Sequence, residues 1–501
     1  MTLSQSDVII CLTNKDWYIM EILAAILAGT IYGLIIGIIP SAGATTGLVL
    51  MFGFISWFTA FDPYLGVIFV MAVVAASTTG DSFSGVLLGI PGANSAAATM
   101  VDGFPLALQG KATYALTAAI TTSTVNGLLW GTLTFALLPW YGSLIMIFGI
   151  PELWAFVMLA LATVGFVSSK FWVRSLCAIG IGCFIGLIGM DPHTASDRYT
   201  FGWDYLADSV QIMPFVAGLF AVPEILKGLF GKAQVAKMQT TQRGQTWEGV
   251  KAVWDNKWDG LRGGFIGAFI GFLPGLGGAM SDWMAYGATT AANPNEKIPF
   301  GQGNIKGVIG PEGSNNAQKA TSMIPTVLFG IPGASFAAIV MALFMYLDFE
   351  LGTVDLMQDT QFFNSMFIGF MGATLLVCVI CLVFTRWIAM ITYVPYWIYG
   401  PVLLVFVTWA CVQPYYRWED YAIFILCSVL GITAKYTKFS RPAMLIGFIL
   451  ADRIESLSLQ MTSLYTIDTL LQRPIFLGLC AAVIGMFIYG VFINKTRLDY
   501  S

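Results

Sequence analysis

Long apolar runs recur along the chain and alternate with shorter segments that carry most of its charges. Three of the clearest runs cover residues 144–167, 363–384 and 476–493, and Pro151 and Glu152 interrupt the first of them. A helix of about 20 apolar residues crosses the hydrocarbon core of a bilayer. When runs that are short or broken by glycine and proline are included, the pattern predicts roughly a dozen transmembrane segments. We therefore expect an all-α, polytopic integral membrane protein.

The composition supports this expectation. Of the 501 residues, 57% are hydrophobic and only 10% are charged, and the mean hydropathy is +0.77. Soluble domains carry about 25% charged residues, so a soluble protein is excluded. The formal net charge of −4 lies in loops and gives no reason to expect a nucleic acid partner. Residues 1–16 lack the basic start of a signal peptide, so the first apolar run is expected to remain in the membrane.

Residues that support catalytic or metal chemistry are sparse. Most of the eight cysteines lie in apolar runs, where a thiol behaves as a small apolar side chain. The Cys378-x-x-Cys381 spacing also occurs in redox and metal sites, but metal ligation favours nearby histidine, and the single histidine, His193, lies beside Asp191. No catalytic set of side chains can be assembled, and no phosphate-binding glycine loop is present in the sequence. We expect no enzyme activity, no cofactor and no metal other than a sodium ion.

Two glycine- and proline-rich motifs occur once in each half of the chain, in the same order. The segment Gly33-x-x-x-Gly37-x-x-Pro40 matches a segment that begins at Gly267, and Gly-Ile-Pro-Gly-Ala occurs at residues 89–93 and again at 330–334. The offset between copies is 234 for the first motif (267 minus 33) and 241 for the second (330 minus 89). These copies predict a first repeat in residues 1–226, a cytoplasmic linker with an amphipathic helix in 227–260 and a second repeat in 261–452, followed by a C-terminal loop and an additional transmembrane helix in 453–501.

The distribution of charged residues predicts how the repeats are oriented, because Lys and Arg favour cytoplasmic loops. Basic stretches lie at residues 170–174, 227–262, 435–441 and 495–497, and acidic loops lie at 191–208 and 348–359. The run after the first Gly-Ile-Pro-Gly then leads from Lys111 inside to Pro139 outside, whereas its counterpart leads from Asp359 outside to Arg386 inside. The repeats are therefore predicted to be inverted, with the C-terminus cytoplasmic and the N-terminus outside. Inverted repeats are typical of secondary transporters, whose binding site lies near the bilayer midplane.

The repeated motifs are candidate breaks in membrane helices. Proline removes an amide donor, and glycine allows the backbone to approach a ligand closely. Irregular backbone at membrane depth is tolerated where it is buried in protein or lines a cavity. Such breaks can direct the positive ends of half-helices at an anion, although proline and glycine are also common as simple kinks.

Polar side chains cluster around these breaks, and polar groups are costly in a bilayer unless they find partners or serve a pathway. We expect them to converge on one midplane cavity. The candidate solute-binding residues are Pro40, Ser41, Ala42, Gly43, Ser82, Ser84, Pro91, Gly92, Asn94, Ser95, Pro274, Gly275, Leu276, Gly277, Asn315, Asn316, Pro332, Gly333 and Ser335. Candidates for sensing a coupling cation are Asp81, Asp282 and Glu312, which alternatively cap helices or face water.

The order of the motifs resembles that of the large membrane subunit of the tripartite tricarboxylate transporters over nearly the whole chain. In the first half the resemblance rests on residues 80–92, Asp102-Gly103-x-Pro105 and Gln109-Gly110-Lys111-Ala112. In the second half it rests on residues 273–277, 285–287 and 300–303 and on Pro311-Glu312-x-Ser314-Asn315-Asn316-Ala317. The chain departs from the family pattern at Ser41, Ala42, Thr79, Asp81 and Gly89, which leaves tricarboxylate as the solute in doubt.

This resemblance implies uptake of a small organic anion, such as citrate, a dicarboxylate or an aromatic acid, driven by a sodium or proton gradient. The implied partners are a small membrane subunit of about four helices and a periplasmic solute-binding protein. The fold would contain re-entrant hairpins and move as an elevator-type carrier in a bacterial inner membrane. A membrane channel or facilitator without ion coupling remains the alternative function, because polar hairpins also suit a channel.

Overall fold

The computed structural model describes residues 5–39, 43–89, 96–138, 148–166, 172–191, 196–230, 245–274, 277–391, 396–412 and 417–498. Helices make up nearly all of these ranges. The sheet within them consists of two short antiparallel strands, β1 (Gly189–Met190) and β2 (Asp197–Arg198), with Gly189 opposite Arg198. The prediction of an all-α protein is confirmed.

The first part of the chain forms a series of helices: α1 (Gln5–Ile38), α2 (Gly43–Met51), α3 (Ser56–Phe61), α4 (Pro63–Leu88), α5 (Ala97–Leu108) and α6 (Ala112–Leu137). α4 has sequence signals at both ends. Its N-terminus is capped by Asp62, whose side chain accepts a hydrogen bond from the backbone N–H of Tyr64, and Pro63 occupies the first turn. Gly89 ends the helix with a left-handed φ of 63°.

A similar series of helices occupies the second half: α13 (Lys257–Phe272), α14 (Gly277–Ala292), α15 (Lys306–Phe329), α16 (Ser335–Tyr346), α17 (Val354–Gln358) and α18 (Thr360–Ile391). α15 ends at Gly330 with a φ of 63°, the same value as at Gly89 after α4. The following helices, α5 and α16, each contain 12 residues. The helices end at the repeated motifs as predicted, and Pro40 and Ile90 lie outside the described residues.

Glycines allow two pairs of long helices to pack with their backbones in close contact. On α1, a Cβ added to Gly33 or Gly37 would lie 2.8 or 2.2 Å from a carbonyl oxygen of α4. On α13, a Cβ added to Gly267 would lie 2.3 Å from the carbonyl oxygen of Ser314 in α15. The repeated Gly-x-x-x-Gly spacing therefore serves close helix packing, as small residues do in membrane proteins generally. We call these two contacts the glycine seams.

The two series of helices pack reciprocally against each other. α18 lies against α4, and its counterpart α6 lies against α15. Likewise α16 contacts α2, α5 contacts α14, and α6 contacts α18. Reciprocal contacts of this kind are expected when the helices of one half are related to those of the other half by a two-fold axis. Inversion of the repeats across a membrane and the predicted domain boundaries stay predictions.

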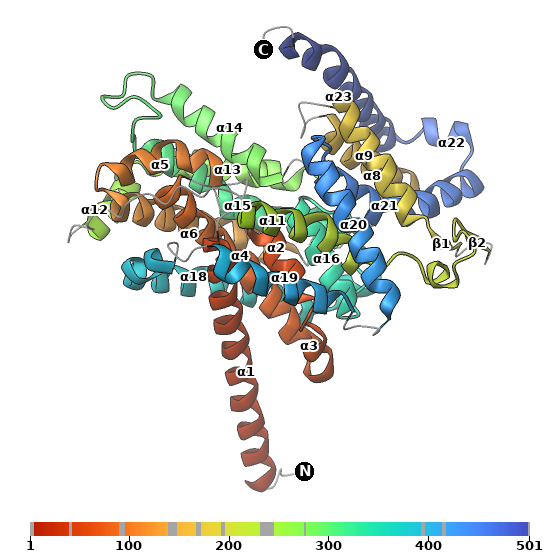
Figure 1. Ribbon diagram of the computed structural model, residues 1–501, viewed down its shortest axis with the longest axis horizontal. Coiled ribbons are helices and arrows are strands. Elements are labelled where there is room, and N and C mark those ends of the chain that lie inside the picture. Colours follow the sequence, from red (N-terminus) through yellow and green to blue (C-terminus); the bar gives the residue numbers. More distant parts are fainter. Residues whose placement is uncertain are drawn as a thin grey trace.

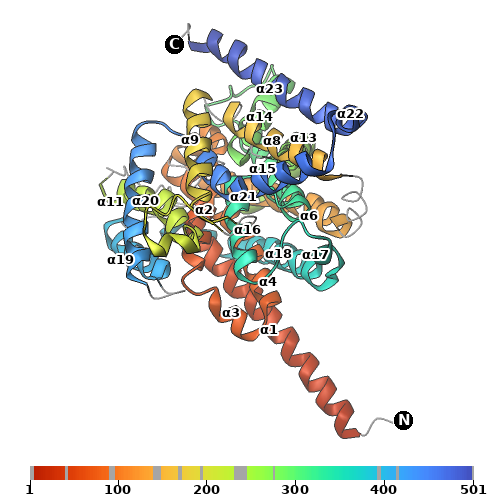
Figure 2. The same cartoon turned by 90° about the vertical axis from the view of Figure 1, so that its right-hand side faces the viewer.

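The remaining helices surround this centre. They are α8 (Ile150–Phe166), α9 (Trp172–Gly186), η3 (Asp204–Asp208), α10 (Ile212–Val216), the π-helical turn η4 (Ala217–Ala221), α11 (Val222–Phe230), α12 (Gln245–Asp255), α19 (Tyr396–Val412), α20 (Trp418–Tyr436), α21 (Arg441–Leu464), α22 (Ile467–Leu471) and α23 (Pro474–Leu498). α8, α9, α21 and α23 form one group, and α12 lies on the opposite side next to α5 and α6 (Figure 1). α1 projects from the helical body in both views (Figure 2).

Three described helices are long and apolar enough to cross a membrane: Tyr18–Ile38, Pro63–Leu88 and Thr360–Thr385. Six shorter apolar helices accompany them, among them Ala97–Leu108 and Ser335–Tyr346, the segments that follow Gly89 and Gly330. Short apolar helices after a break suit segments that enter a bilayer without crossing it. The dozen transmembrane segments expected from the sequence remain a prediction.

Candidate functional site

α15 presents four polar residues on one of its faces. Glu312, Asn315, Asn316 and Lys319 follow the i, i+3, i+4, i+7 spacing that places side chains on one side of a helix. All four are buried. α15 is central in the molecule and packs against α4, α5, α6, α13 and α14, so this polar face meets other helices.

Side chains of α4 and α14 meet α15 at two positions around the helix, because Glu312 and Ser314 are two residues apart and do not share a face. The hydroxyl of Ser82 in α4 donates a hydrogen bond to Glu312 Oε1 at 2.8 Å. In α14, the hydroxyl of Ser281 lies 3.1 Å from that of Ser314, which donates to Asp282 Oδ1. Three helices that are far apart in the sequence therefore join in one buried polar cluster, which we define as Asp81, Ser82, Ser281, Asp282, Glu312, Ser314, Asn315 and Lys319.

Several charged atoms of the buried polar cluster have no hydrogen-bond partner. Both carboxylate oxygens of Asp81, Oδ2 of Asp282 and Nζ of Lys319 are buried and unpaired. Leaving a buried charge without its partner typically costs about 3–5 kcal/mol. Ionisable groups inside a membrane protein usually mark a path for ions or solutes. The unpaired carboxylate oxygens and the ammonium of this cluster can therefore bind a charged ligand.

The electrostatics of the cluster favour an added cation. If all groups are ionised, its three carboxylates and one ammonium give a formal charge of −2 (three negative, one positive). The charges of Asp81, Asp282 and Glu312 all act on the ammonium of Lys319. None of the ion pairs in the described part of the chain includes Lys319, so no carboxylate is in direct contact with it. A sodium ion or a proton would reduce the excess negative charge.

Lys319 is the functional candidate that the sequence interpretation misses. Lys319 is not among the residues predicted from the sequence, and it is separated along the chain from the glycine-rich turns on which that prediction rests. The helical spacing from Glu312 to Lys319 was the signal that identifies it. The ammonium lies 5.6 Å from the centroid of the Phe336 ring, and Phe336 follows Ser335 at the start of α16. The lysine is therefore close to the second Gly-Ile-Pro-Gly turn.

The second-half candidates are distributed around the cluster. Gly277 opens α14 with a φ of 71°, and a Cβ added there would meet no atom within 4 Å. The carbonyl of Pro274 accepts a hydrogen bond from Thr163 of α8. The backbone N–H of Gly333 donates to Thr326 Oγ1 at 3.1 Å, and Pro332 beside it is buried. Asn316 lies against Gly127 of α6, and neither atom of its amide has a partner.

The first-half candidates are only partly covered by the structure. Asp81 and Ser82 lie in the buried polar cluster, but the hydroxyl of Ser84 donates to the carbonyl of Asp81 in its own helix at 3.1 Å. Gly43 begins α2. The candidates outside the described residues are Pro40, Ser41, Ala42, Pro91, Gly92, Asn94 and Ser95, together with Gly275 and Leu276 of the second half. Convergence of all candidates on one cavity stays a prediction.

Asp102 of α5 joins the first half of the chain to the second half. Its Oδ1 accepts hydrogen bonds from the backbone N–H groups of Gly301 (2.8 Å), Gly303 (2.9 Å) and Asn304 (2.8 Å). Its Oδ2 accepts from the hydroxyl of Tyr286 at 2.9 Å. A carboxylate that accepts four hydrogen bonds fixes the loop between α14 and α15, and thereby the start of α15.

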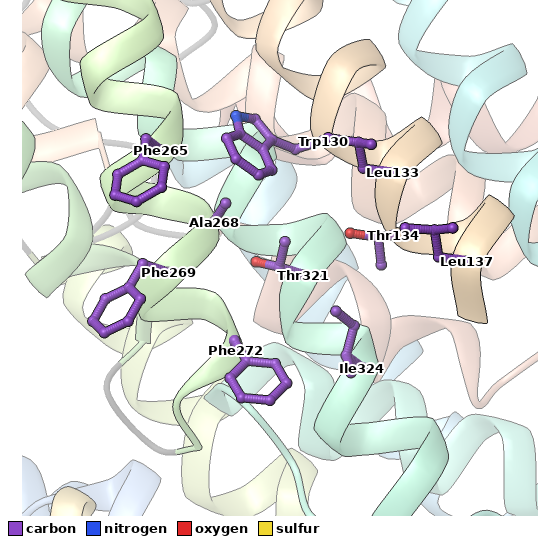
Figure 3. Close-up of a pocket in the computed structure, with 10 residues that line it drawn as sticks. All are labelled: Trp130, Leu133, Thr134, Leu137, Phe265, Ala268, Phe269, Phe272, Thr321 and Ile324. Carbon is purple, nitrogen blue, oxygen red and sulfur yellow. The ribbon is translucent and has the colours of Figure 1, made fainter. Parts of the chain in front are cut away.

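An apolar groove of about 370 Å³ lies between α6, α13 and α15 (Figure 3). It is lined by Trp130, Leu133, Thr134, Leu137, Phe265, Ala268, Phe269, Phe272, Thr321 and Ile324. Its three phenylalanine side chains stand along α13, and its polar groups are the two threonine hydroxyls and the indole of Trp130 on α6 (Figure 3). No charged side chain lines the groove, so it suits a hydrocarbon chain better than an anion.

A larger cleft of about 740 Å³ lies where α12 meets α5, α6 and the loop before α15. Its charged lining residues are Lys111, Glu248, Lys251, Asp255, Glu296 and Lys297. Positive and negative side chains are equal in number, so the cleft offers no strong preference for an anion. In the described residues no group of three or more His, Cys, Asp or Glu side chains is arranged to hold a metal ion.

Comparisons with known proteins identify relatives of the chain. Residues 23–446 match the tripartite tricarboxylate transporter TctA family. A similar protein from Agrobacterium vitis, described as an uncharacterized 52.8 kDa protein in the TAR-I ttuC' 3' region, is 28% identical over 437 residues, covering 85% of this chain and 84% of that protein. An uncharacterized protein in the TAR-II ttuC' 3' region of the same organism is 29% identical over 186 residues, covering 36% of this chain and 75% of that protein.

No solved structure matches the chain. The family match covers most of the sequence, including α4, α14 and α15 with the whole buried polar cluster. It confirms the resemblance that the order of the motifs predicts. The protein therefore belongs to the TctA family of tripartite tricarboxylate transporters, and is a multi-pass membrane protein of a transport system.

Proposed function

We propose that this protein is the large permease subunit of a binding-protein-dependent transporter and carries a small organic anion, most simply a carboxylate, into the cell. The observation that carries the proposal is the buried polar cluster, where charged atoms without partners lie between three helices of a transport protein. Buried groups of this kind are costly in the resting protein and gain partners when an ion and a solute bind.

We propose that uptake is secondary active and uses a sodium or proton gradient. Asp81, Asp282 and Glu312 are the coupling candidates, because their formal charge exceeds that of Lys319. A cation in the cluster lowers the electrostatic cost of bringing an anion nearby. The half-helix N-termini that follow the breaks, each equivalent to about half a positive charge, add further attraction for the anion.

The proposed mechanism is an elevator-type movement of two inverted repeats in a bacterial inner membrane, with the C-terminus cytoplasmic. Reciprocal packing of α4 with α18 and of α15 with α6 supports a two-fold arrangement. The proposed partners are a small membrane subunit of about four helices and a periplasmic solute-binding protein, as the three-part character of the family implies.

Solute flux tests this proposal against a channel without ion coupling. The protein is reconstituted into proteoliposomes with its small subunit, and uptake of labelled citrate, succinate and benzoate is measured with the solute-binding protein present. We expect uptake above equilibrium only when a sodium or proton gradient is imposed. Equilibration without accumulation under either gradient would identify a channel or facilitator instead.

A further inference from the structure

Lys319 has a buried ammonium group without a direct partner within the described part of the chain, whereas a buried lysine with a structural role is normally paired. Its side chain is in the interior of the protein, with 4% of the residue exposed, and it is the one buried Lys or Arg among the described residues. Its ammonium donates no hydrogen bond and forms no direct ion pair in that part of the chain. An ammonium in a low-dielectric interior is costly unless it is paired with an anion, and no side chain of the described residues supplies that pairing directly.

Two kinds of group surround Lys319. The charges of Asp81, Asp282 and Glu312 act on its ammonium. The ammonium also lies 5.6 Å from the centroid of the Phe336 ring, and Phe336 follows the second Gly-Ile-Pro-Gly turn at the start of α16. The turn itself is held to α15 close to the lysine, because a Cβ on Gly333 would lie 2.8 Å from the carbonyl oxygen of Ser322.

We propose that Lys319 binds the carboxylate group of the transported solute, and that Asp81 is its electrostatic partner when no solute is present. The proposal rests on the proposed function and names the group that recognises the solute. Of the three acidic residues, Asp81 fits the partner role best, because Glu312 accepts from Ser82 and Asp282 accepts from Ser314, whereas neither oxygen of Asp81 accepts a hydrogen bond.

This arrangement couples the solute to a cation through charge alone. When a carboxylate pairs with Lys319, the cluster carries one more negative charge, and Asp81 loses the ammonium as its counter-charge. The affinity of the cluster for sodium or a proton then rises, and by reciprocity a bound cation raises the affinity for the solute. Neither ligand needs to contact the other.

Thermal unfolding of the purified full-length chain in detergent tests the proposal without requiring transport. The melting temperature is measured with and without citrate, succinate and benzoate for the wild type, Asp81→Asn, Lys319→Arg and the double variant Asp81→Asn/Lys319→Gln. The double variant removes both charges together, so neither is left uncompensated. Lys306→Gln is the matched control, because Lys306 lies on the same helix but pairs with Glu296 at 2.7 Å.

We expect at least one of these anions to raise the melting temperature of the wild type, Asp81→Asn, Lys319→Arg and Lys306→Gln. The double variant should lose at least about tenfold in anion affinity, or about 1.4 kcal/mol. Equal stabilisation of the double variant, or no stabilisation of the wild type by any of the three anions, would overturn the proposal. Anion stabilisation without any uptake in proteoliposomes would reject the carrier function while leaving this binding site in place.

Discussion

At the scale of single residues, Asp81 is the group whose contribution to coupling is easiest to isolate. It lies within α4, and neither of its carboxylate oxygens has a hydrogen-bond partner. Asp81→Asn keeps the size of the side chain and removes its charge. We expect the dependence of uptake on the driving cation to weaken, because the cluster then attracts a cation less strongly. Initial uptake rates over a series of sodium concentrations and pH values measure this effect.

The matched control is Asp62→Asn, the same chemical change at the N-terminus of the same helix. Asn caps a helix about as well as Asp, so α4 should retain its start. The cation dependence of Asp62→Asn should equal that of the wild type. If Asp81→Asn also keeps the wild-type cation dependence, Asp81 is not a coupling residue.

The left-handed backbone of Gly277 gives a second prediction. Its φ of 71° strains any residue with a Cβ by about 1–2 kcal/mol, although the position has open space around it. We expect Gly277→Ala to lower the melting temperature in detergent. Gly287→Ala on the same helix has equally open space and ordinary helical backbone, so it should not destabilise the protein. Equal melting temperatures for both variants would show that α14 does not depend on this turn.

Its motif suggests that Gly333 lets the backbone approach a ligand, but in the structure this glycine packs against α15. A Cβ there would lie within 3.0 Å of three atoms of Ser322, so a valine at this position would disturb packing on α15. Loss of transport in Gly333→Val would therefore not show that Gly333 contacts the solute, because the packing defect alone would explain it. The glycine of the repeated turn is required at least for the contact between α15 and the turn.

The sequence alone identifies much of the polar cluster. Asp81, Asp282 and Glu312 are predicted as coupling candidates because acidic residues in apolar segments are unusual, and they lie together in the structure. Lys319 is absent from the predicted residues because it is far from the glycine-rich turns along the chain. In a helix, the relevant quantity is the angular position, which places it on the same face as Glu312.

At the scale of elements, Asp102 links α5 to the loop that precedes α15. Asp102→Ala leaves three backbone N–H groups without their acceptor, and each loss costs about 1–3 kcal/mol when the donor is buried. We expect a lower melting temperature and faster proteolytic cleavage between residues 293 and 303. Limited proteolysis in detergent followed by mass spectrometry measures the cleavage.

Asp102→Asn serves as the comparison, because it retains one acceptor oxygen and loses only the charge. Its cleavage rate should lie between those of the wild type and Asp102→Ala. Cleavage of Asp102→Ala at the wild-type rate would show that other contacts fix the loop.

Helix ends were easier to predict than helix contacts. The breaks after Phe272 and Phe329 follow from proline and glycine chemistry, and the structure ends α13 and α15 there. The sequence predicts the glycines at 33, 37, 267 and 271 as parts of these breaks, whereas they lie inside α1 and α13 and pack against the backbones of α4 and α15. A spacing of four residues describes one face of a helix, but it does not identify the helix that packs against it.

At the scale of the whole molecule, the charge distribution predicts opposite sides of the membrane for α12 and α17. Lys251 and Asp355 are exposed on these helices and suit single-cysteine labelling in a cysteine-free background. In intact cells, a membrane-impermeant maleimide should label Asp355→Cys and leave Lys251→Cys unlabelled, because Lys and Arg concentrate in cytoplasmic loops.

Permeabilised cells provide the control for this experiment, since both positions should then react. Equal labelling of the two positions in intact cells would contradict inverted repeats.

The reciprocal packing of the two series of helices could not be derived from the sequence, because a repeated motif shows that two segments are alike and leaves their relative placement open.

The glycine seams also determine which parts of the molecule can move against each other. Because carbonyl oxygens of α4 and α15 occupy the space that a Cβ would need, a slide or rotation that brings a residue with a side chain to these positions of α1 or α13 would clash with that backbone. α1 with α4, and α13 with α15, are therefore expected to move as two rigid helix pairs. Asp81 belongs to one pair, and Glu312 and Lys319 belong to the other. Any displacement of one helix pair against the other changes the distances between these charges, so ligand binding to the cluster and the conformation of the protein are coupled.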